Sequence, residues 1–275
     1  MAETPAYIDA MQASLVLNLS ALASLLPVSA LTLKRPLQRG TLFWLLLAVA
    51  VAGSAVAAID KLAHGWLSSL SAALWLSIVA SLVMFVVVSA LTRQGWRLAP
   101  LLLPYLFLLG VGAALTEYVP PAAVIATPDR WAEVHALVSV ATYGLLTLAA
   151  IAGFAVFLQE RALKRRQPGA LTQWLPSVAD AELLQIRLLG ASGVVLGLGL
   201  LTGAATLYVE TGAFFEISHK TIFVVTAFAV IILLLLVHRR TGLRGRRAAR
   251  LVLLAYLLVT LAYPGVKLVT DVILA

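Results

Sequence analysis

The sequence predicts an all-α protein, a polytopic membrane helix bundle of eight transmembrane helices with both termini on the outer side. Three observations support this prediction. Of the 275 residues, 62% are hydrophobic and 12% are charged, whereas a soluble domain has about 45–50% apolar and about 25% charged residues. The apolar residues form eight runs that are long enough to cross a bilayer. Lys and Arg are concentrated in every second connection between these runs.

The eight runs reach the length that a spanning helix needs, about 20 residues for roughly 30 Å of hydrocarbon. Each is expected to be helical, because backbone groups in lipid must be hydrogen-bonded within their own segment. We predict a single transmembrane domain over 1–275, with four spans in 1–130 and four in 131–275. In chain order the predicted spans are 7–33, 42–60, 66–91, 98–118, 132–158, 185–208, 219–238 and 248–270.

The basic residues orient the chain, because Lys and Arg are retained in cytoplasmic connections. Sixteen of the twenty Lys and Arg residues lie on one side of the predicted bundle, within 34–39, 93–97, 161–187 and 239–250. The other side holds Lys61, Arg130, Lys220 and Lys267, and nine of the twelve acids. The first side is therefore predicted to be cytoplasmic, which places both termini outside.

Local signals mark the connection between spans five and six and the end of span eight. A basic run, Arg161–Arg166, is followed by a break at Pro168–Gly169. Ser177 precedes Asp180 with the spacing of a capping box, which predicts that a helix begins there. In span eight, Pro264 predicts a kink near the outer face.

Span six is rich in glycine. Gly193 and Gly197 are four residues apart, as are Gly199 and Gly203. This spacing permits close approach of a neighbouring helix. It equally makes room for a flat cofactor, so both interpretations stay open.

The composition excludes several classes of protein. There is no cysteine, so disulfides, thiolate zinc sites, cysteine-ligated iron–sulfur clusters and covalent c-type haem are excluded. The net charge of +8 comes from short connections between spans, so no nucleic-acid partner is predicted. Neither an H-E-x-x-H nor a G-x-S-x-G pattern occurs, which disfavours zinc and serine hydrolases.

Ionisable residues at the ends of spans are candidates for function. His64, His135 and His219 all fall at the outer ends of their spans, whereas His238 lies at an inner end beside arginines. Two imidazoles from facing helices at equal depth can clamp a planar cofactor, usually haem. We therefore predict non-covalent b-type haem with His135 and His219 as axial ligands of the iron. The alternative is that each histidine is an ordinary interfacial residue.

The residues beside these histidines suit the same cofactor. Haem propionates would face water and need cationic partners, which Arg130 and Lys220 are placed to supply. Trp131 precedes His135 by four residues and, with His64, is a further candidate for the site.

The second half of the chain resembles the cytochrome c assembly protein family, the haem-handling membrane proteins of the CcsA/CcmC type. The resemblance covers 131–272 and is nearest to the eight-span HemX-like and YpjD-like branch. Its most specific parts are the G-x-R-G-R-R-A motif at 242–248 and the histidine that opens span seven before it. Residues 1–130 match the family only in span number and polarity.

The resemblance implies a multi-pass protein of the bacterial inner membrane that handles haem at the outer, periplasmic face. In haem-handling members two outer histidines act as axial ligands around a tryptophan-rich loop, and these positions correspond to His135 and His219. Here the equivalent loop reads YVETGAFFEIS and has no tryptophan. This favours an accessory, non-enzymatic role in cytochrome c assembly over delivery of haem itself.

Other functions remain as alternatives. The protein is expected to contact the bilayer, haem and other cytochrome c assembly or haem-biosynthesis proteins. It is alternatively a structural or regulatory scaffold for such a partner, without haem chemistry. A solute transporter needs polar residues deep in the bundle, and the spans show few. A quinone-to-haem oxidoreductase normally has a second pair of histidines on the inner side, where only His238 is present.

Overall fold

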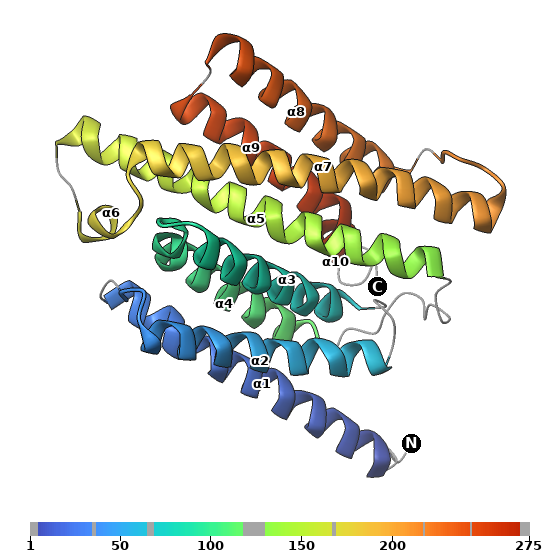
Figure 1. Cartoon of the computed structure of the whole chain (residues 1–275). Helices are drawn as coiled ribbons and strands as arrows, with labels where there is room; N and C mark the ends of the chain where they lie inside the picture. Colours follow the sequence, from blue (N-terminus) through green and yellow to red (C-terminus); the bar gives the residue numbers. More distant parts are fainter. Residues whose placement is uncertain are drawn as a thin grey trace.

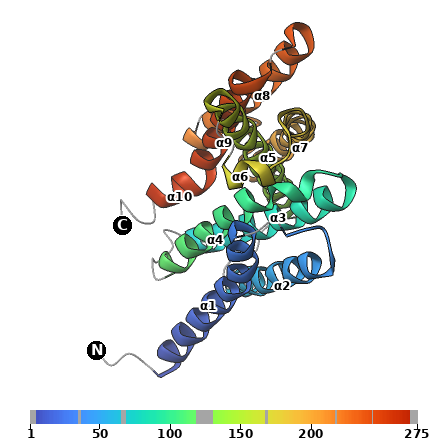
Figure 2. The same cartoon turned by 90° about the vertical axis from the view of Figure 1, so that its left-hand side faces the viewer.

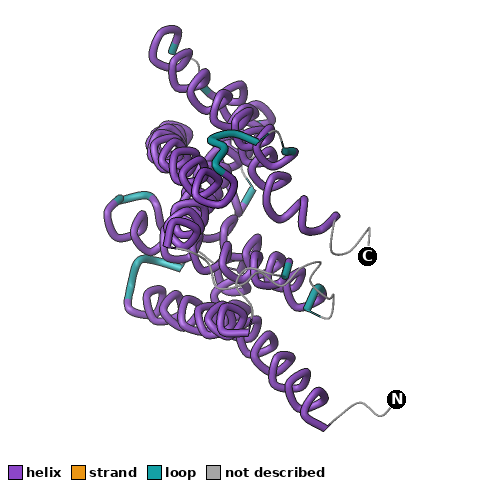
Figure 3. The backbone as a smooth tube through the Cα atoms, turned by 90° about the vertical axis from the view of Figure 1, so that its right-hand side faces the viewer, coloured by secondary structure: helices purple, strands orange, loops and turns teal. Residues whose placement is uncertain are grey.

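A computed structural model shows the chain as an assembly of helices (Figure 1). It describes residues 5–34, 37–64, 69–117, 130–166, 169–216, 218–242 and 244–269. Within these ranges there is no β-strand, as the tube in Figure 3 shows. Eight described helices are long and apolar enough to cross a membrane. The all-α, eight-span prediction is therefore confirmed.

The helices divide into two groups of four spans. The first group is α1 (Pro5–Lys34), α2 (Thr41–His64), α3 (Leu70–Leu91) and α4 (Ala99–Leu115), which the 3₁₀ turn η1 (Gly95–Leu98) precedes. The second group contains α5 (Arg130–Arg165), the short α6 (Ala170–Trp174), α7 (Val178–Thr211) and α8 (His219–Thr241). It ends with α9 (Gly245–Thr260), the π-helical η2 (Leu261–Gly265) and α10 (Val266–Leu268).

Two helices are longer than the predicted spans. α5 has 36 residues and α7 has 34, whereas about 20 residues cross the hydrocarbon. Their polar ends continue the helix beyond the apolar run, which hydrophobicity alone does not detect. As predicted, Ser177 caps α7, because its hydroxyl accepts a hydrogen bond from the Asp180 amide at 3.2 Å. The helix runs unbroken from there into the span.

The helix ends are divided between two opposite ends of the molecule. The beginnings of α1, α5 and α8 lie with α10 at one end, here called the N/C end, on the right of Figure 1. The connection from α8 to α9 lies at the opposite end, here called the basic end, which Figure 2 shows from outside. Both termini therefore lead from the same end, as an even number of spans requires.

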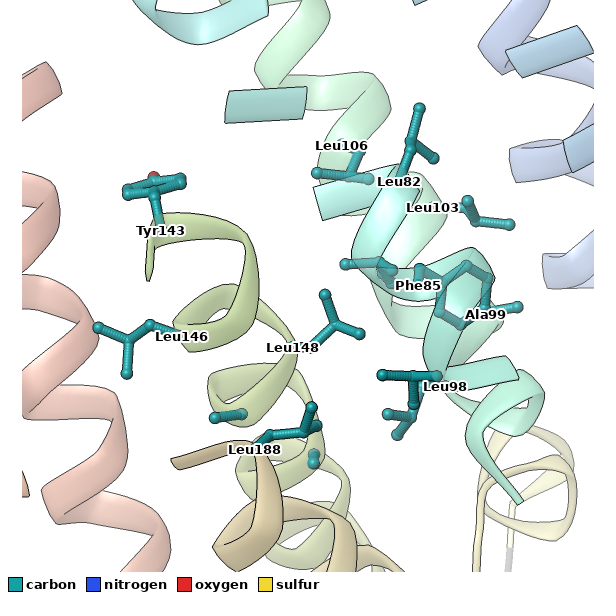
Figure 4. Close-up of a cluster of buried hydrophobic side chains, with 14 of the residues drawn as sticks. Leu82, Phe85, Leu98, Ala99, Leu103, Leu106, Tyr143, Leu146, Leu148 and Leu188 are labelled. Atoms are coloured by element: carbon teal, nitrogen blue, oxygen red, sulfur yellow. The ribbon is translucent and has the colours of Figure 1, made fainter. Parts of the chain in front are cut away.

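α5 joins the two groups of spans. It packs along α7 over the most extensive interface in the described chain, and it also contacts α3 and α9. Figure 4 shows Phe85 of α3 and Leu103 of α4 across from Leu148 of α5, with Leu188 of α7 nearby. The side chains of Phe85, Leu103 and Leu148 are completely inaccessible to solvent, and Leu188 is also buried. This packing makes the two groups one continuous core.

A cluster of tyrosines adds a polar contact within this core. The hydroxyls of Tyr105 on α4 and Tyr256 on α9 are hydrogen-bonded to each other. The Tyr143 hydroxyl on α5 lies 3.0 Å from that of Tyr256. Tyr256 therefore links one helix of the first group to two helices of the second. Pairing these three hydroxyls offsets the cost of removing them from water.

Candidate functional site

The predicted site lies at the N/C end, where the first turns of α5 and α8 are found (Figure 1). α8 begins at His219 because Ser218 adopts an extended backbone and its hydroxyl accepts the Thr221 amide hydrogen bond at 3.3 Å. Such a cap satisfies an amide that the first turn leaves unpaired. The cap thus fixes His219 as the first residue of the helix.

His135 lies one turn into α5 and contacts α7. Its Nδ1 is 3.1 Å from the Gly199 carbonyl oxygen and 3.2 Å from the Thr202 hydroxyl. A carbonyl only accepts hydrogen bonds, so Nδ1 carries the proton in this arrangement. The Thr202 hydroxyl itself donates to the Gly199 carbonyl, which leaves its lone pairs free to accept. Nε2 is then the nitrogen with the free lone pair.

Gly203 provides the space that the His135 ring occupies. A Cβ on Gly203 would lie 3.0 Å from His135 Cε1 and 3.3 Å from Nδ1. Both distances are closer than ordinary van der Waals contact. The absence of a side chain at Gly203 therefore lets the imidazole lie against α7.

The other glycine pair of this helix serves helix packing. A Cβ on Gly193 would lie 3.0 Å from Ile231 of α8, and one on Gly197 would lie 3.4 Å from Phe228. The interpretation of these glycines as sites of close helix approach is confirmed for α8. At Gly203 the same absence of a side chain makes room for the histidine.

The structure places His219 and Lys220 on an exposed part of α8. α8 packs against α7 and α9, so both histidine-bearing helices contact α7. The hydrogen bonds of the His135 ring are made with α7. The fold thus brings the two histidines to one end of the molecule without joining their side chains by a hydrogen bond in the described chain.

The other candidate residues for the site, Arg130, Trp131 and His64, also lie on helix ends at the N/C end. Arg130 and Trp131 open α5, and both are exposed. His64 is the last residue of α2, and its side chain lies outside the described part of the structure. His238 lies in the last turn of α8, at the basic end, as expected. Among the described residues no three His, Asp or Glu side chains form a metal cluster.

A buried ion pair at the N/C end is a feature that the sequence patterns did not single out. Lys61 of α2 and Glu117, just after α4, are paired, with side chains 8% and 15% exposed. Ser14 of α1 and Ser71 of α3 donate hydrogen bonds to the two carboxylate oxygens of Glu117. The pair and its two serines thereby tie together all four helices of the first group. Opposite charges at the outer ends of spans two and four were the available signal.

The surroundings of Glu117 control its protonation. Burial alone raises the pKa of this carboxyl group. Hydrogen bonds from Lys61, Ser14 and Ser71, and the charge of Lys61, oppose burial and hold the pKa of Glu117 below its ordinary value. The carboxylate is therefore ionised at neutral pH, as the pairing with Lys61 requires.

Comparisons with known proteins agree with this architecture. The sequence model of the Cytochrome C assembly protein family matches residues 36–274, so the match includes spans two to four as well as the second half. A protein of Azospirillum brasilense, named as an uncharacterized 28.8 kDa protein in the nifR3-like 5' region, is 51% identical over 270 residues. That alignment covers 96% of this chain and all of the relative.

A more distant relative has a name that gives its location. Inner membrane protein YpjD of Escherichia coli K12 is 29% identical over 210 residues, which is 75% of this chain and 76% of YpjD. No solved structure matches the chain. Eight apolar helices and these relatives place the protein in the bacterial inner membrane as a multi-pass protein. The chain belongs to the Cytochrome C assembly protein family.

Proposed function

We propose that this protein binds haem non-covalently at the N/C end and serves cytochrome c assembly as an accessory protein, without being an enzyme itself. His135 and His219 are the proposed axial ligands, and Arg130 and Lys220 are the proposed partners of the propionates. The observation that carries the proposal is the hydrogen bond between His135 Nδ1 and the Gly199 carbonyl. Family membership supplies the link to cytochrome c assembly.

The geometry around His135 fits the chemistry of a haem ligand. Histidines that bind metals usually donate their second ring N–H to a carbonyl or carboxylate, which fixes the tautomer and the ring orientation. His135 has this arrangement, because its Nδ1 is paired with the Gly199 carbonyl and Nε2 is left with a lone pair for a metal. Gly203 supplies the space in which the ring is held.

The cationic residues suit the rest of the cofactor. Arg130 and Lys220 stand next to Trp131 and His219 in the sequence, and both are exposed at the N/C end. Cations of this kind form charge-assisted hydrogen bonds to carboxylates such as propionates. Bound haem would supply an iron centre with two axial positions for imidazole nitrogens.

The connection between α7 and α8 supports the accessory role. Phe214 stacks on Tyr208 of α7, with ring centroids 4.3 Å apart, and no tryptophan follows. The aromatic surface here is thus small and lies partly against the protein's own helix. Haem presentation to an acceptor is assigned to another protein in this proposal.

The same connection favours a second candidate function, that of a scaffold for an assembly partner. Phe214 and Phe215 are both exposed, and aromatic residues of this kind are enriched at protein interfaces. A scaffold would still bind its partner when both histidines are replaced, whereas a haem protein would no longer bind haem.

The deciding experiment is an absorption spectrum of the detergent-purified protein, oxidised and reduced, with added haem. We expect a Soret band for the natural sequence, a shifted or weakened band for His135→Ala and for His219→Ala, and loss of the band in the double variant. His238→Ala, at the basic end, is the matched control and should leave the spectrum unchanged. A spectrum that is identical in the natural protein and the double variant contradicts the proposal.

A further inference from the structure

The basic end carries a cleft that the proposed haem site does not use. It lies between the end of α5 and the beginning of α9, and its volume is about 550 Å³. One carboxylate and five cations line it: Glu160, Lys164, Arg244, Arg246, Arg247 and Arg250. Four of these residues belong to the arginine-rich segment that begins with the G-x-R-G-R-R-A motif. The function proposed above leaves this motif unexplained.

One side of the cleft is a fixed junction between three helices. Arg246 Nε lies 3.3 Å from Glu160 Oε2, and its guanidinium stands over the Phe157 ring at 5.1 Å. The Gly245 amide donates a hydrogen bond of 2.6 Å to Glu182 of α7. Arg246 is therefore held by a carboxylate and a ring, and the first two residues of α9 tie it to α7 and α5.

Gly245 is required for this junction. Its φ angle is +67°, and a Cβ there would lie 2.2 Å from Glu160 Oε1. Residues with side chains rarely adopt this backbone conformation. The glycine within the motif thus lets the backbone turn against the Glu160 carboxylate and present the arginines on either side.

In the part of the chain that the structure describes, the other four cations have no carboxylate partner. Lys164, Arg244, Arg247 and Arg250 are exposed at the cleft. In the described chain none of them forms an ion pair. Four like charges around one opening repel each other unless an anion lies between them. Arginine forks match the oxygens of a phosphate group in particular.

An apolar stripe runs from the cleft along α9. Arg250 is followed by Leu254 and Leu257 of α9 and by Leu261, the first residue of η2. The spacings of four, three and four residues place all four on one helix face. The three leucines are 42%, 52% and 40% exposed. A surface with cations at the bilayer boundary and leucines below it matches a phospholipid, whose phosphate and acyl chains lie in this order.

We propose that this cleft is a binding site for a phosphate group, and that the adjoining leucine stripe makes an anionic phospholipid of the cytoplasmic leaflet its source. The site depends on Arg244, Arg247 and Arg250, with Lys164 facing them from α5. It is independent of haem, since it lies at the opposite end of the molecule from His135.

The test is native mass spectrometry of the delipidated, full-length protein in detergent, with phosphatidylglycerol and phosphatidylcholine added in equal amounts. The cleft variant is Arg244→Gln/Arg247→Gln/Arg250→Gln. The control is Arg161→Gln/Arg165→Gln/Arg166→Gln, which removes the same charge from exposed residues at the same end that do not line the cleft. Thermal unfolding without lipid shows whether both variants are folded.

The natural protein and the control should retain phosphatidylglycerol over phosphatidylcholine. The cleft variant should bind it at least tenfold more weakly, because a charge-assisted hydrogen bond from an arginine to a phosphate contributes roughly tenfold or more. Equal losses in both triple variants would show diffuse surface attraction and overturn the site. Equal binding of both lipids by the natural protein would overturn it too.

A second arm distinguishes the two sources of phosphate. Glycerol 3-phosphate and inorganic phosphate are added as competitors at millimolar concentration. If they leave bound phosphatidylglycerol in place, the acyl chains contribute and the lipid is supported as the ligand. If they displace it from the natural protein and stabilise the natural protein but not the cleft variant, the phosphate site stands but a soluble phosphate compound is its source.

Discussion

At the scale of single residues, the proposed site depends on which ring nitrogen of His135 has a lone pair for the iron. The Gly199 carbonyl accepts from Nδ1 and leaves Nε2 as the donor of a lone pair. A histidine at a span end is compatible with many roles when the sequence is considered alone. Its position against Gly203 is what distinguishes this one.

Gly203 and Gly190 on α7 offer a matched comparison. Alanine in place of a helical glycine normally stabilises by about 0.5–1 kcal/mol. Gly190→Ala should follow this rule, because no atom lies within 4 Å of the added Cβ. Gly203→Ala should give no gain or a loss, since the Cβ would meet the His135 ring at 3.0 Å. Thermal midpoints of the two variants in detergent check this, and equal stabilisation would contradict the observed packing of His135.

At the scale of helices, the Lys61–Glu117 pair and its serine partners hold α1 to α4 together. Glu117→Gln leaves the Lys61 charge in a site where only 8% of the side chain is exposed. Breaking a buried pair in this way costs about 3 kcal/mol. The double variant Lys61→Met/Glu117→Leu leaves no charge behind and should recover most of that loss. A double variant as unstable as Glu117→Gln would contradict the role of the pair.

The same pair predicts a dependence of stability on pH. The folded-state pKa of Glu117 is lowered from its ordinary value near 4.5. A carboxyl group of this kind contributes stability above the unfolded-state pKa, and loses it as pH falls through the folded-state value. The difference in thermal midpoint between the natural protein and Glu117→Gln should thus be full at pH 7 and shrink below pH 4.5. A difference that stays constant to pH 3 would show that ionised Glu117 is not the stabilising group.

At the scale of the whole molecule, α5 and the tyrosine cluster join two groups of spans. Tyr256→Phe should leave the hydroxyls of Tyr105 and Tyr143 without their shared partner. The expected cost is about 1 kcal/mol in thermal or denaturant unfolding. Tyr208→Phe is the control, because that side chain is exposed at the end of α7, and it should change stability little. Equal effects of the two variants would contradict a connecting role for Tyr256.

Much of the architecture was predictable because the bilayer imposes it. Hydrocarbon excludes unpaired backbone groups, so each long apolar run had to be a helix, and all eight appear in the structure. The predicted spans five and six were shorter than α5 and α7. The polar ends of both helices extend beyond the apolar runs, and hydrophobicity detects only the apolar runs. Ser177 was predicted correctly, since a capping hydroxyl acts on an amide only three residues away.

The sequence by itself determined the class of protein, the number of spans, the common end of the two termini and the family resemblance. These properties follow from local chemistry, because each span meets lipid independently of the others. Only the tertiary structure decided that His135 lies against Gly203, that Lys61 meets Glu117 and that Glu160 holds Arg246. Each of these contacts joins helices far apart in the chain. Which faces meet depends on side-chain packing, because lipid solvates every apolar face almost equally well.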